Sequence, residues 1–141
     1  VFSFFVGVSA LTESAIAFVA GLDWSPLAIM ALILVLYLLL GSLMESFAVM
    51  VITVPIVTPL VTKLGYDVVW WGVIMLCVVE TGLIHPPFGL NVFVLKSMLP
   101  KVPLWTIYKG VLPFVAADLV KLVLLVLFPA ITMWLPGTMM K

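Results

Sequence analysis

Long apolar stretches, separated by short polar or glycine- and proline-rich breaks, fill almost the whole chain. The stretches cover residues 1–22, 26–40, 43–61, 68–99 and 110–135. A straight helix needs about 20 apolar residues to cross a membrane core of roughly 30 Å. The stretches 1–22 and 110–135 meet that length, and we expect each to form one membrane span. The pattern therefore predicts an all-α membrane protein in which the two middle segments, 26–63 and 68–99, are not simple spans.

Residues 26–63 are expected to form a re-entrant helical hairpin, whose two arms enter and leave the membrane on the same side. The first arm, Leu27–Leu40, makes only about 21 Å of helix at 1.5 Å per residue, and Gly41 and Ser42 are expected to interrupt it there. The second arm leads back to a polar turn at 63–67. Irregular backbone at membrane depth is tolerated only where it is buried in protein or lines a cavity. The tip of the hairpin is therefore a candidate site.

Residues 68–99 are expected to form a discontinuous helix, because a break lies near the middle of this apolar stretch. The break is expected at residues 81–89, where Pro86 and Pro87 remove two consecutive backbone donors and glycines loosen the flanks. The half that precedes the break also makes about 21 Å of helix. Because both segments start from the turn at 63–67, the break and the hairpin tip are expected at the same depth.

Charge excludes some functions and indicates an orientation. The chain has 66% hydrophobic residues, 9% charged residues and a formal net charge of zero, with a mean hydropathy of +1.44. Such a composition cannot give a soluble domain a polar surface, and it offers no basic surface for nucleic acid. Lys96, Lys101 and Lys109 are expected in the connection between the broken helix and the last span. Their charge assigns this connection to the cytoplasm, and the C-terminus is then expected in the periplasm.

The two breaks supply the candidate ion-binding groups. In secondary transporters, freed backbone carbonyls at such breaks coordinate Na⁺, and the N-terminal ends of half-helices attract anions. Carbonyl and hydroxyl oxygens for a hard cation are available at Gly41, Ser42, Thr81 and Gly82. The alternative is that glycine and proline only kink packed spans. Two breaks at matching depth favour a binding site, and no metal other than Na⁺ is expected.

Residues around the breaks are also candidates to line the substrate pathway. They are Glu45, Ser46, Glu80, His85, Pro86, Pro87, Gly89 and Asn91. Charged residues inside a membrane segment mark functional sites unless a partner neutralises them. Glu80 either lines the ion pathway or accepts from a freed backbone N–H, and His85 is either a ligand or a hydrogen-bonded packing residue. Asp118 and Lys121 lie three positions apart on one helix face, which favours a structural ion pair over a proton relay.

Six motifs follow one another along most of the chain. They are Tyr37-Leu-Leu-Leu-Gly-Ser-Leu-Met-Glu-Ser, Val54-Pro-Ile-Val-Thr-Pro, Gly65-Tyr-Asp-Val-Val-Trp-Trp-Gly-Val-Ile, Glu80-Thr-Gly-Leu-Ile-His-Pro-Pro-Phe-Gly-Leu-Asn-Val-Phe-Val, Lys109-Gly-Val-Leu-Pro-Phe and Phe128-Pro-Ala-Ile-Thr-Met-Trp-Leu-Pro. In content and order they resemble the C-terminal portion of the large membrane (permease) subunit of tripartite ATP-independent periplasmic (TRAP) transporters. Two positions depart from the family pattern, which usually has Asp in place of Glu45 and Thr in place of His85.

The resemblance implies part of a Na⁺-driven secondary transporter that imports organic acids, such as C4-dicarboxylates, across the bacterial inner membrane. It implies a small membrane subunit and a periplasmic substrate-binding protein as partners, and no cofactor besides the coupling ion Na⁺. The chain is then expected to be a fragment of a longer subunit, and to form the second of two inverted repeats in an elevator-type fold.

Other functions agree less well with the sequence. A stand-alone Na⁺- or H⁺-coupled dicarboxylate carrier of similar architecture would work without a binding protein. A non-transporting assembly subunit would have no use for two breaks inside the membrane. An intramembrane enzyme needs a nucleophile with a base or a metal cluster, and the chain contains no GxSxG or HExxH motif and a single histidine. We therefore expect no enzymatic activity.

Overall fold

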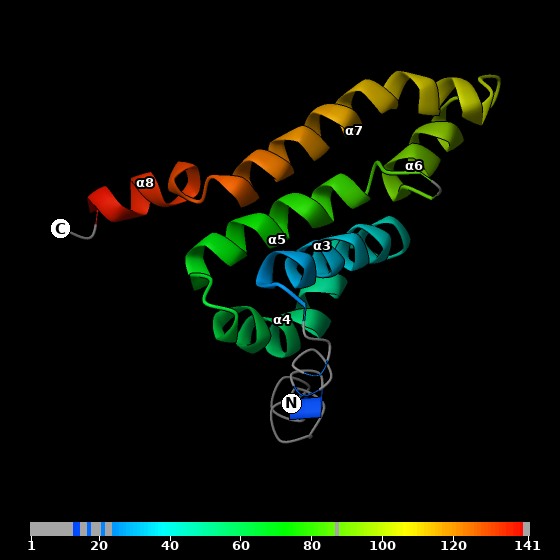
Figure 1. Cartoon of the computed structure of the whole chain (residues 1–141). Coiled ribbons are helices and arrows are strands. Elements are labelled where there is room, and N and C mark those ends of the chain that lie inside the picture. The colour runs from blue at the N-terminus through cyan, green and yellow to red at the C-terminus, as the bar shows by residue number, and fades with distance from the viewer. Residues whose placement is uncertain (1–12, 15–16, 18–20, 22–23, 87, 140–141) are drawn as a thin grey trace.

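The computed structural model describes residues 13–14, 17, 21, 24–86 and 88–139. All regular secondary structure in this part of the chain is helical: α3 (Pro26–Leu43), α4 (Ser46–Lys63), α5 (Val68–Gly82), α6 (Leu90–Met98), α7 (Leu104–Leu127) and α8 (Ala130–Met139) (Figure 1). The all-helical prediction is confirmed for these residues. Three helices, α3, α4 and α7, are long and apolar enough to cross a membrane. Most of the predicted span 1–22 lies outside the described residues.

Two extended residues join α3 and α4 into a helical hairpin. Ser25 caps the start of α3, where its hydroxyl accepts a hydrogen bond from the Ala28 N–H at 3.3 Å. Met44 and Glu45 both have extended backbone, which separates the two helices. Each arm has 18 residues, or about 27 Å of helix. The arms are therefore longer than the predicted half-depth arm of about 21 Å.

The prediction that Gly41 and Ser42 interrupt the first arm is wrong, because both residues are helical and the joint lies just beyond them. A glycine inside a helix costs only about 1 kcal/mol relative to alanine, which close packing can offset. The Ser42 hydroxyl donates to the Leu39 carbonyl at 2.8 Å. The serine side chain thus bonds back to its own helix instead of ending it.

A short polar turn connects α4 to α5. Gly65 has a φ of 91°, a left-handed conformation that glycine adopts without a steric penalty. Asp67 then starts α5, because its carboxylate accepts from the N–H groups of Val69 at 2.7 Å and Trp70 at 3.2 Å.

The helices α5 and α6 are separate, so the expected discontinuity is present. The interruption covers residues 83–89, and Thr81 and Gly82, which the sequence placed in the break, form the last turn of α5. The reason is the position of Pro86, whose ring removes the hydrogen bond to carbonyl 82 and clashes with it. The helix can therefore continue as far as Gly82. It resumes as α6 after Gly89, whose φ is 60°.

The last predicted span, 110–135, has different boundaries in the structure. The helix α7 begins at residue 104, directly after Pro103, and ends at residue 127. Pro129 has no N–H to continue the helical ladder, and a separate helix, α8, starts at the next residue. The span and the tail that follows it are thus two helices (Figure 1).

Two of the three lysines used to orient the chain do not lie in the connection between helices. Lys109 belongs to α7, and Lys96 belongs to α6. The Lys96 ammonium donates to the carbonyls of Pro100 at 2.9 Å and Val102 at 2.7 Å, which ties α6 to the connection that follows it. Since only Lys101 remains in the connection, the periplasmic position of the C-terminus stays a prediction.

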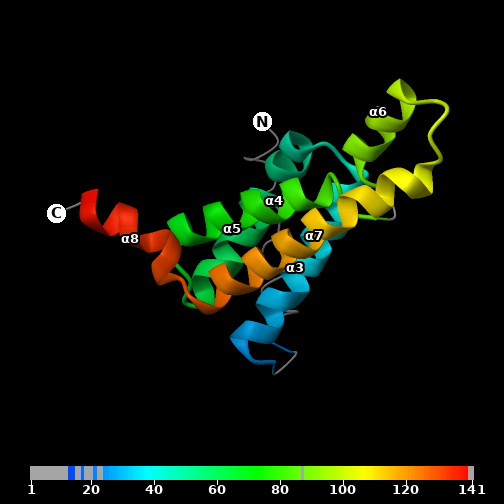
Figure 2. The ribbon, with the colours of Figure 1, turned by 90° about the horizontal axis from the view of Figure 1, so that it is seen from above.

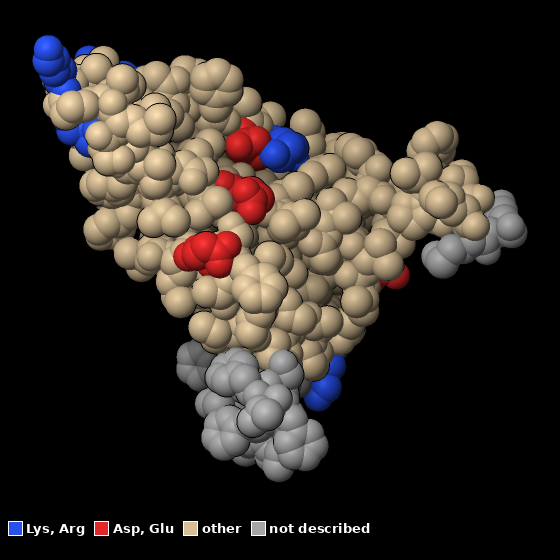
Figure 3. Space-filling view, turned by 180° about the vertical axis from the view of Figure 1, so that it is seen from behind, with Lys and Arg blue, Asp and Glu red and all other residues tan. Residues whose placement is uncertain are grey.

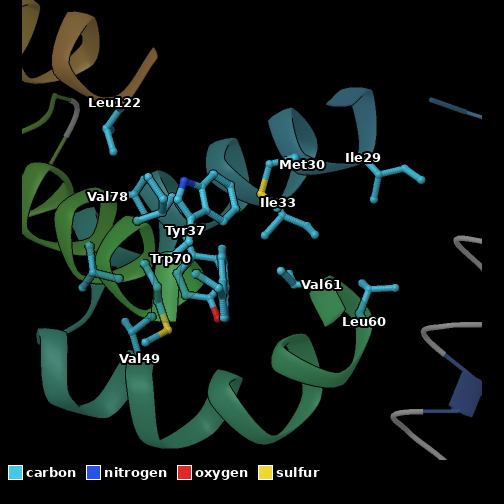
Figure 4. Packing of buried hydrophobic residues seen from close by; sticks show 14 residues of the cluster. Ile29, Met30, Ile33, Tyr37, Val49, Leu60, Val61, Trp70, Val78 and Leu122 are labelled. Atoms are coloured by element: carbon cyan, nitrogen blue, oxygen red, sulfur yellow. The ribbon is translucent and has the colours of Figure 1, made fainter. Parts of the chain in front are cut away.

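The helix α5 lies at the centre of the structure. The most extensive packing is between α3 and α5, while α4 and α7 contact α5 elsewhere and α6 and α8 extend at opposite ends (Figures 1 and 2). Large buried side chains fill the space around α5, among them Met30, Tyr37, Trp70, Trp71 and Ile74 (Figure 4). The ring of Tyr37 meets that of Trp71 edge to face, with centroids 5.5 Å apart. The Trp70 indole N–H donates to the Leu125 carbonyl at 3.1 Å, which ties α7 to α5.

Candidate functional site

Two glycines bring the C-terminal ends of α3 and α5 into direct backbone contact. A Cβ atom added to Gly41 would lie 2.7 Å from the Val79 carbonyl oxygen, and one added to Gly82 would lie 2.8 Å from Gly41 Cα. These distances leave no room for a side chain on either residue. The structure therefore brings together all four residues predicted to bind an ion, since Ser42 follows Gly41 and Thr81 precedes Gly82.

The site formed by these four residues, called the paired helix ends below, is buried and electronegative. Ser42 is 3% exposed and Thr81 is 1% exposed. The Thr81 hydroxyl donates to the Cys77 carbonyl at 2.8 Å, as Ser42 does to Leu39, so each hydroxyl oxygen keeps lone pairs free to accept. The C-terminal end of a helix carries a partial negative charge and carbonyls without helical partners. Two such ends side by side favour a cation.

The ligands available here suit a hard cation held by neutral oxygens. Within the described residues, no group of three or more His, Cys, Asp and Glu side chains could hold a metal ion. Backbone carbonyls and hydroxyls are the ligands that secondary transporters use for Na⁺ at the unwound ends of half-helices. The paired helix ends have this chemistry.

A hydrogen bond between side chains connects the start of α4 to the end of α5, beside the residue that caps α4. The Ser46 hydroxyl donates to Glu80 Oε1 at 2.9 Å, which links the first turn of α4 to the last turn of α5. The Glu45 carboxylate accepts from the N–H groups of Phe47 at 2.9 Å and Ala48 at 3.1 Å. Glu45 thus caps α4, and its two oxygens already have donors. Glu80 thus accepts a hydrogen bond from a hydroxyl group. From the sequence, two roles were open for it: lining the ion pathway, or accepting from a freed backbone N–H.

Acidic groups gather near the middle of one face of the molecule, and clusters of basic groups lie towards its edges (Figure 3). Glu45 and Glu80 are the described acidic residues of the tip and of the α5 end. A basic group lies beside another of the acidic groups, as Lys121 does beside Asp118 of α7, with 2.6 Å between Lys121 Nζ and Asp118 Oδ1. Asp118 and Lys121 thus have the geometry of the structural ion pair that their spacing indicates, in which one charge neutralises the other.

The break between α5 and α6 is a tight turn that folds back on itself. The His85 N–H donates to the Gly82 carbonyl at 3.1 Å, and the Asn91 N–H donates to the Leu83 carbonyl at 3.1 Å. A Cβ atom on Gly89 would lie 3.2 Å from the His85 carbonyl oxygen. His85 Nδ1 is buried and has no hydrogen-bond partner among the described residues. His85 Nδ1 is therefore a buried polar atom whose hydrogen-bonding capacity is not satisfied within this part of the chain. Pro86 precedes Pro87, which lies outside the described residues.

The start of α6 offers a complementary, electropositive end. Its N-cap residue, Gly89, makes no side-chain capping bond, and the N–H groups of Asn91 and Val92 donate to the backbone carbonyls of Leu83 and Gly89. The N-terminal end of a helix carries a partial positive charge and binds anions. Asn91, in the first turn, has an exposed side chain that can reach a ligand. Paired C-terminal ends and this N-terminal end thus present opposite charges at the same break.

A contact from α7 holds the break, and no pattern in the sequence indicates this contact. The Tyr108 hydroxyl donates to the Phe88 carbonyl at 2.6 Å. Tyr108 also packs with Val92 and Ile107 in a small second core between α6 and α7. A tyrosine one turn into an apolar helix has no feature that distinguishes it from a packing residue, so only the fold identifies this role.

An apolar groove of about 450 Å³ runs between α3 and α7, away from these polar groups. Its lining is entirely aliphatic: Leu27, Ala31, Leu34, Val35, Leu38, Val78, Leu119, Leu122, Val123, Val126 and Leu127. Polar groups that orient a small ligand are what distinguish a specific binding site from apolar surface. The groove offers none, so the candidate site is the junction of the tip and the break.

Comparison with known proteins agrees with this architecture. The chain is 38% identical over 117 residues to the isethionate TRAP transporter permease protein DctMQ of Oleidesulfovibrio alaskensis, which covers 83% of this chain and 18% of that protein. It is 33% identical over 127 residues to the C4-dicarboxylate TRAP transporter large permease protein DctM of Pseudomonas aeruginosa, which covers 90% of this chain and 30% of that protein.

A third relative matches almost the whole chain. The sialic acid TRAP transporter large permease protein SiaM of Vibrio cholerae is 31% identical over 136 residues, which covers 96% of this chain and 32% of that protein. The chain thus spans a third or less of the length of these relatives. The sequence profile of the family described as the tripartite ATP-independent periplasmic transporter, DctM component, matches residues 1–131. This protein chain therefore belongs to the DctM component family of tripartite ATP-independent periplasmic transporters.

Proposed function

We propose that this chain supplies one half of the ion- and substrate-binding centre of a transporter that imports organic acids across the bacterial inner membrane, driven by a Na⁺ gradient. The observation that carries the proposal is the contact between the ends of α3 and α5 at Gly41 and Gly82, close in the chain to the start of α6, which has no side-chain cap. Family membership supports it, because the matched relatives are named as TRAP transporter permeases.

The cation is proposed to bind at the paired helix ends. A Na⁺ ion there accepts oxygen ligands from Gly41, Ser42, Thr81 and Gly82 and offsets the repulsion between two partially negative helix ends. Carbonyl and hydroxyl oxygens do not take up a proton near neutral pH. The site would thus respond to a metal ion gradient and not to a proton gradient.

The substrate is proposed to be an organic anion held near the start of α6. The relatives are named for isethionate, C4-dicarboxylates and sialic acid, all of which are organic acids. The positive end of α6 favours an acidic group, and the His85 ring and the Asn91 amide can donate to it. Because the TRAP family usually has Thr at the position of His85, this ring is the proposed source of a substrate preference specific to this chain.

The hairpin is proposed to be re-entrant, although each arm is long enough to span by length alone. The helix α5 has 15 residues, or about 22 Å, so it ends inside a membrane core of roughly 30 Å. The contact between Gly41 and Gly82 holds the hairpin tip at the same depth. The chain would then be the second of two inverted repeats in an elevator-type fold, and the remainder of the subunit would supply the other half of the centre.

The transporter is proposed to act with a small membrane subunit and a periplasmic binding protein that delivers the substrate. The test is uptake by proteoliposomes that contain the full-length subunit carrying this chain and its small subunit. Uptake of labelled isethionate, a C4-dicarboxylate and sialic acid is measured with and without binding protein, in Na⁺ or in K⁺. The proposal predicts uptake that requires both Na⁺ and binding protein. Uptake in K⁺, or without binding protein, would contradict it.

Variants of the paired helix ends make the test specific. Thr81→Val removes a hydroxyl at constant shape, and we expect the Na⁺ concentration for half-maximal uptake to rise about ten-fold, which corresponds to roughly 1.4 kcal/mol. Thr106→Val is the matched control, because Thr106 is exposed in α7 and lies far along the chain from both helix ends. Equal Na⁺ dependence for the two variants would remove the paired helix ends as the cation site.

A further inference from the structure

The carboxylate of Glu80 occupies an unfavourable position for an anion. Glu80 lies in the last turn of α5, where the partial negative charge of the helix end repels a carboxylate. The end of α3 adds a second negative end next to it, through the contact of Gly41 with Gly82. A charged residue in an apolar segment that lacks a cationic partner points to a functional role. A cation bound at the paired helix ends would relieve this repulsion.

The partner of Glu80 belongs to the hairpin arm that the glycine contact does not hold. Glycine contact fixes α3 against α5, whereas α4 begins after the two extended residues Met44 and Glu45. The bond from Ser46 Oγ to Glu80 Oε1 at 2.9 Å bridges the first turn of α4 and the last turn of α5. Ser46 is 7% exposed, while the Glu80 side chain is exposed. The bond therefore ties the buried start of α4 to the end of α5.

The bond lies next to the proposed cation ligands on both sides. Glu80 is adjacent in sequence to Thr81, and Ser46 begins the helix that follows Ser42 and the tip. A hydrogen bond to a carboxylate is about twice as strong as one between neutral groups. Charge and position together suit Glu80 to hold the hairpin closed over a bound cation.

We propose that Glu80 is a positioning residue of the cation site. It acts through Ser46, by holding the start of α4 against the end of α5, and its charge raises the affinity of the paired helix ends for Na⁺. This inference rests on the proposed function, because it assumes that a cation binds there. The Glu45 carboxylate has no such role, since its hydrogen bonds within the described residues go to backbone N–H groups of its own helix.

The test uses the full-length subunit with its small subunit and binding protein in proteoliposomes. Ser46→Ala removes the donor and Glu80→Gln removes the charge while keeping an acceptor. Each is expected to raise the Na⁺ concentration for half-maximal uptake at least about ten-fold, the effect of weakening or losing one charge-assisted hydrogen bond. The maximal rate and the substrate KM at saturating Na⁺ should change little. Ser46→Thr should keep the wild-type Na⁺ concentration for half-maximal uptake, because threonine retains the hydroxyl.

A matched control and a double variant make the outcome decisive. Ser97→Ala removes a hydroxyl that donates to the Val94 carbonyl of its own helix, α6, and should leave the Na⁺ dependence unchanged. Ser46→Ala combined with Glu80→Ala should be no worse than Glu80→Ala alone, because Glu80→Ala already removes both the charge and the acceptor of the Ser46 hydroxyl. Additive effects, or a lower maximal rate with unchanged Na⁺ dependence, would overturn the proposal in favour of a merely structural contact.

Hydrogen–deuterium exchange separates this inference from the proposed function. In the purified full-length subunit without Na⁺, amides in the first turn of α4 should exchange faster in Ser46→Ala and Glu80→Gln than in wild type and Ser97→Ala. Equal exchange in all four proteins would overturn the role of Glu80 whatever transport shows. If the two variants exchange faster but uptake by the wild-type protein does not depend on Na⁺, the contact between Ser46 and Glu80 is retained. The role of Glu80 in the cation site and the proposed cation itself would then both be overturned.

Discussion

Replacing Gly82 with alanine puts a methyl group into the closest backbone contact between α3 and α5. The added Cβ would lie 2.8 Å from Gly41 C and Cα and 2.9 Å from the Leu38 carbonyl oxygen. Carbon atoms in contact prefer a separation of about 3.5–4.0 Å. All of the close neighbours are backbone atoms, so no side-chain rotation relieves the clash and the two helices must move apart by roughly 0.7–1.2 Å.

The energetic cost follows from the packing that this movement opens. A radial gap of about 0.5–1 Å already loses a quarter to a half of each contact energy, and overpacked positions in well-packed cores cost about 1–3 kcal/mol. Alanine regains about 1 kcal/mol of helix propensity relative to glycine. Gly72→Ala provides the reference for this gain, because Gly72 lies in the same helix and a Cβ there meets nothing within 4 Å.

The assay is unfolding of the full-length subunit in mixed detergent micelles, followed by tryptophan fluorescence, since Trp70 and Trp71 are buried near α3. Gly82→Ala should be about 1–3 kcal/mol less stable than Gly72→Ala, because the propensity gain is the same in both and cancels. Gly41→Ala should resemble Gly82→Ala, since its Cβ would lie 2.7 Å from a carbonyl oxygen. Equal stability of Gly82→Ala and Gly72→Ala would refute the reasoning that the helix ends touch.

Three further changes test contacts around the site. Glu45→Ala removes the cap of α4 and should cost about 1 kcal/mol, with faster hydrogen exchange in the first turn of α4, whereas Glu45→Asp should restore slow exchange. Tyr37→Phe and Thr53→Val each break the 2.6 Å bond between the two hydroxyls and should each lower the free energy of unfolding by about 1 kcal/mol. Losses that simply add in a double-mutant cycle would contradict the bond. Asp118→Leu leaves the Lys121 charge unpaired, and an unpaired charge near the centre of a span costs about 2.5–3.5 kcal/mol. The variant should therefore reduce membrane insertion, measured by fractionation, while leucine at both positions should restore insertion.

Hydropathy and backbone chemistry alone could predict the helices and the discontinuity. An apolar stretch too long for a plain span identified the segment that contains the discontinuity, and Pro86 located the break between α5 and α6 to within a few residues. A proline acts locally, through the N–H that it lacks and the carbonyl four residues before it. Its effect can therefore be read from the sequence without knowledge of the fold.

The ends of helices and the contacts between them could not be predicted in the same way. Gly41 and Ser42 have the composition of a break, yet both are helical, because packing against Gly82 makes use of the missing side chain. Lys109 reads as a loop residue but lies in α7. Each outcome depends on a partner distant in the sequence, and local propensity is a weak guide where tertiary packing decides.

The site shows the same division. Its residue types were evident from the breaks, but the bond between Ser46 and Glu80 joins positions that no spacing rule connects. The role of Tyr108 depends on the path of α7 over the break. Conversely, the spacing of Asp118 and Lys121 was sufficient to expect a contact, because residues three apart on a helix are neighbours.

The most direct test of the central claim is whether Na⁺ protects the junction of hairpin tip and break. Met44 is exposed at the tip, so Met44→Cys is introduced into the full-length subunit after Cys77 and any other cysteines have been replaced. Its reaction with a membrane-impermeant maleimide is timed in Na⁺ and in choline, with Lys101→Cys, in the connection before α7, as the control. The account predicts that Na⁺ slows the reaction several-fold at position 44 and leaves it unchanged at position 101. Equal rates in both salts at position 44 would contradict a cation site at the paired helix ends.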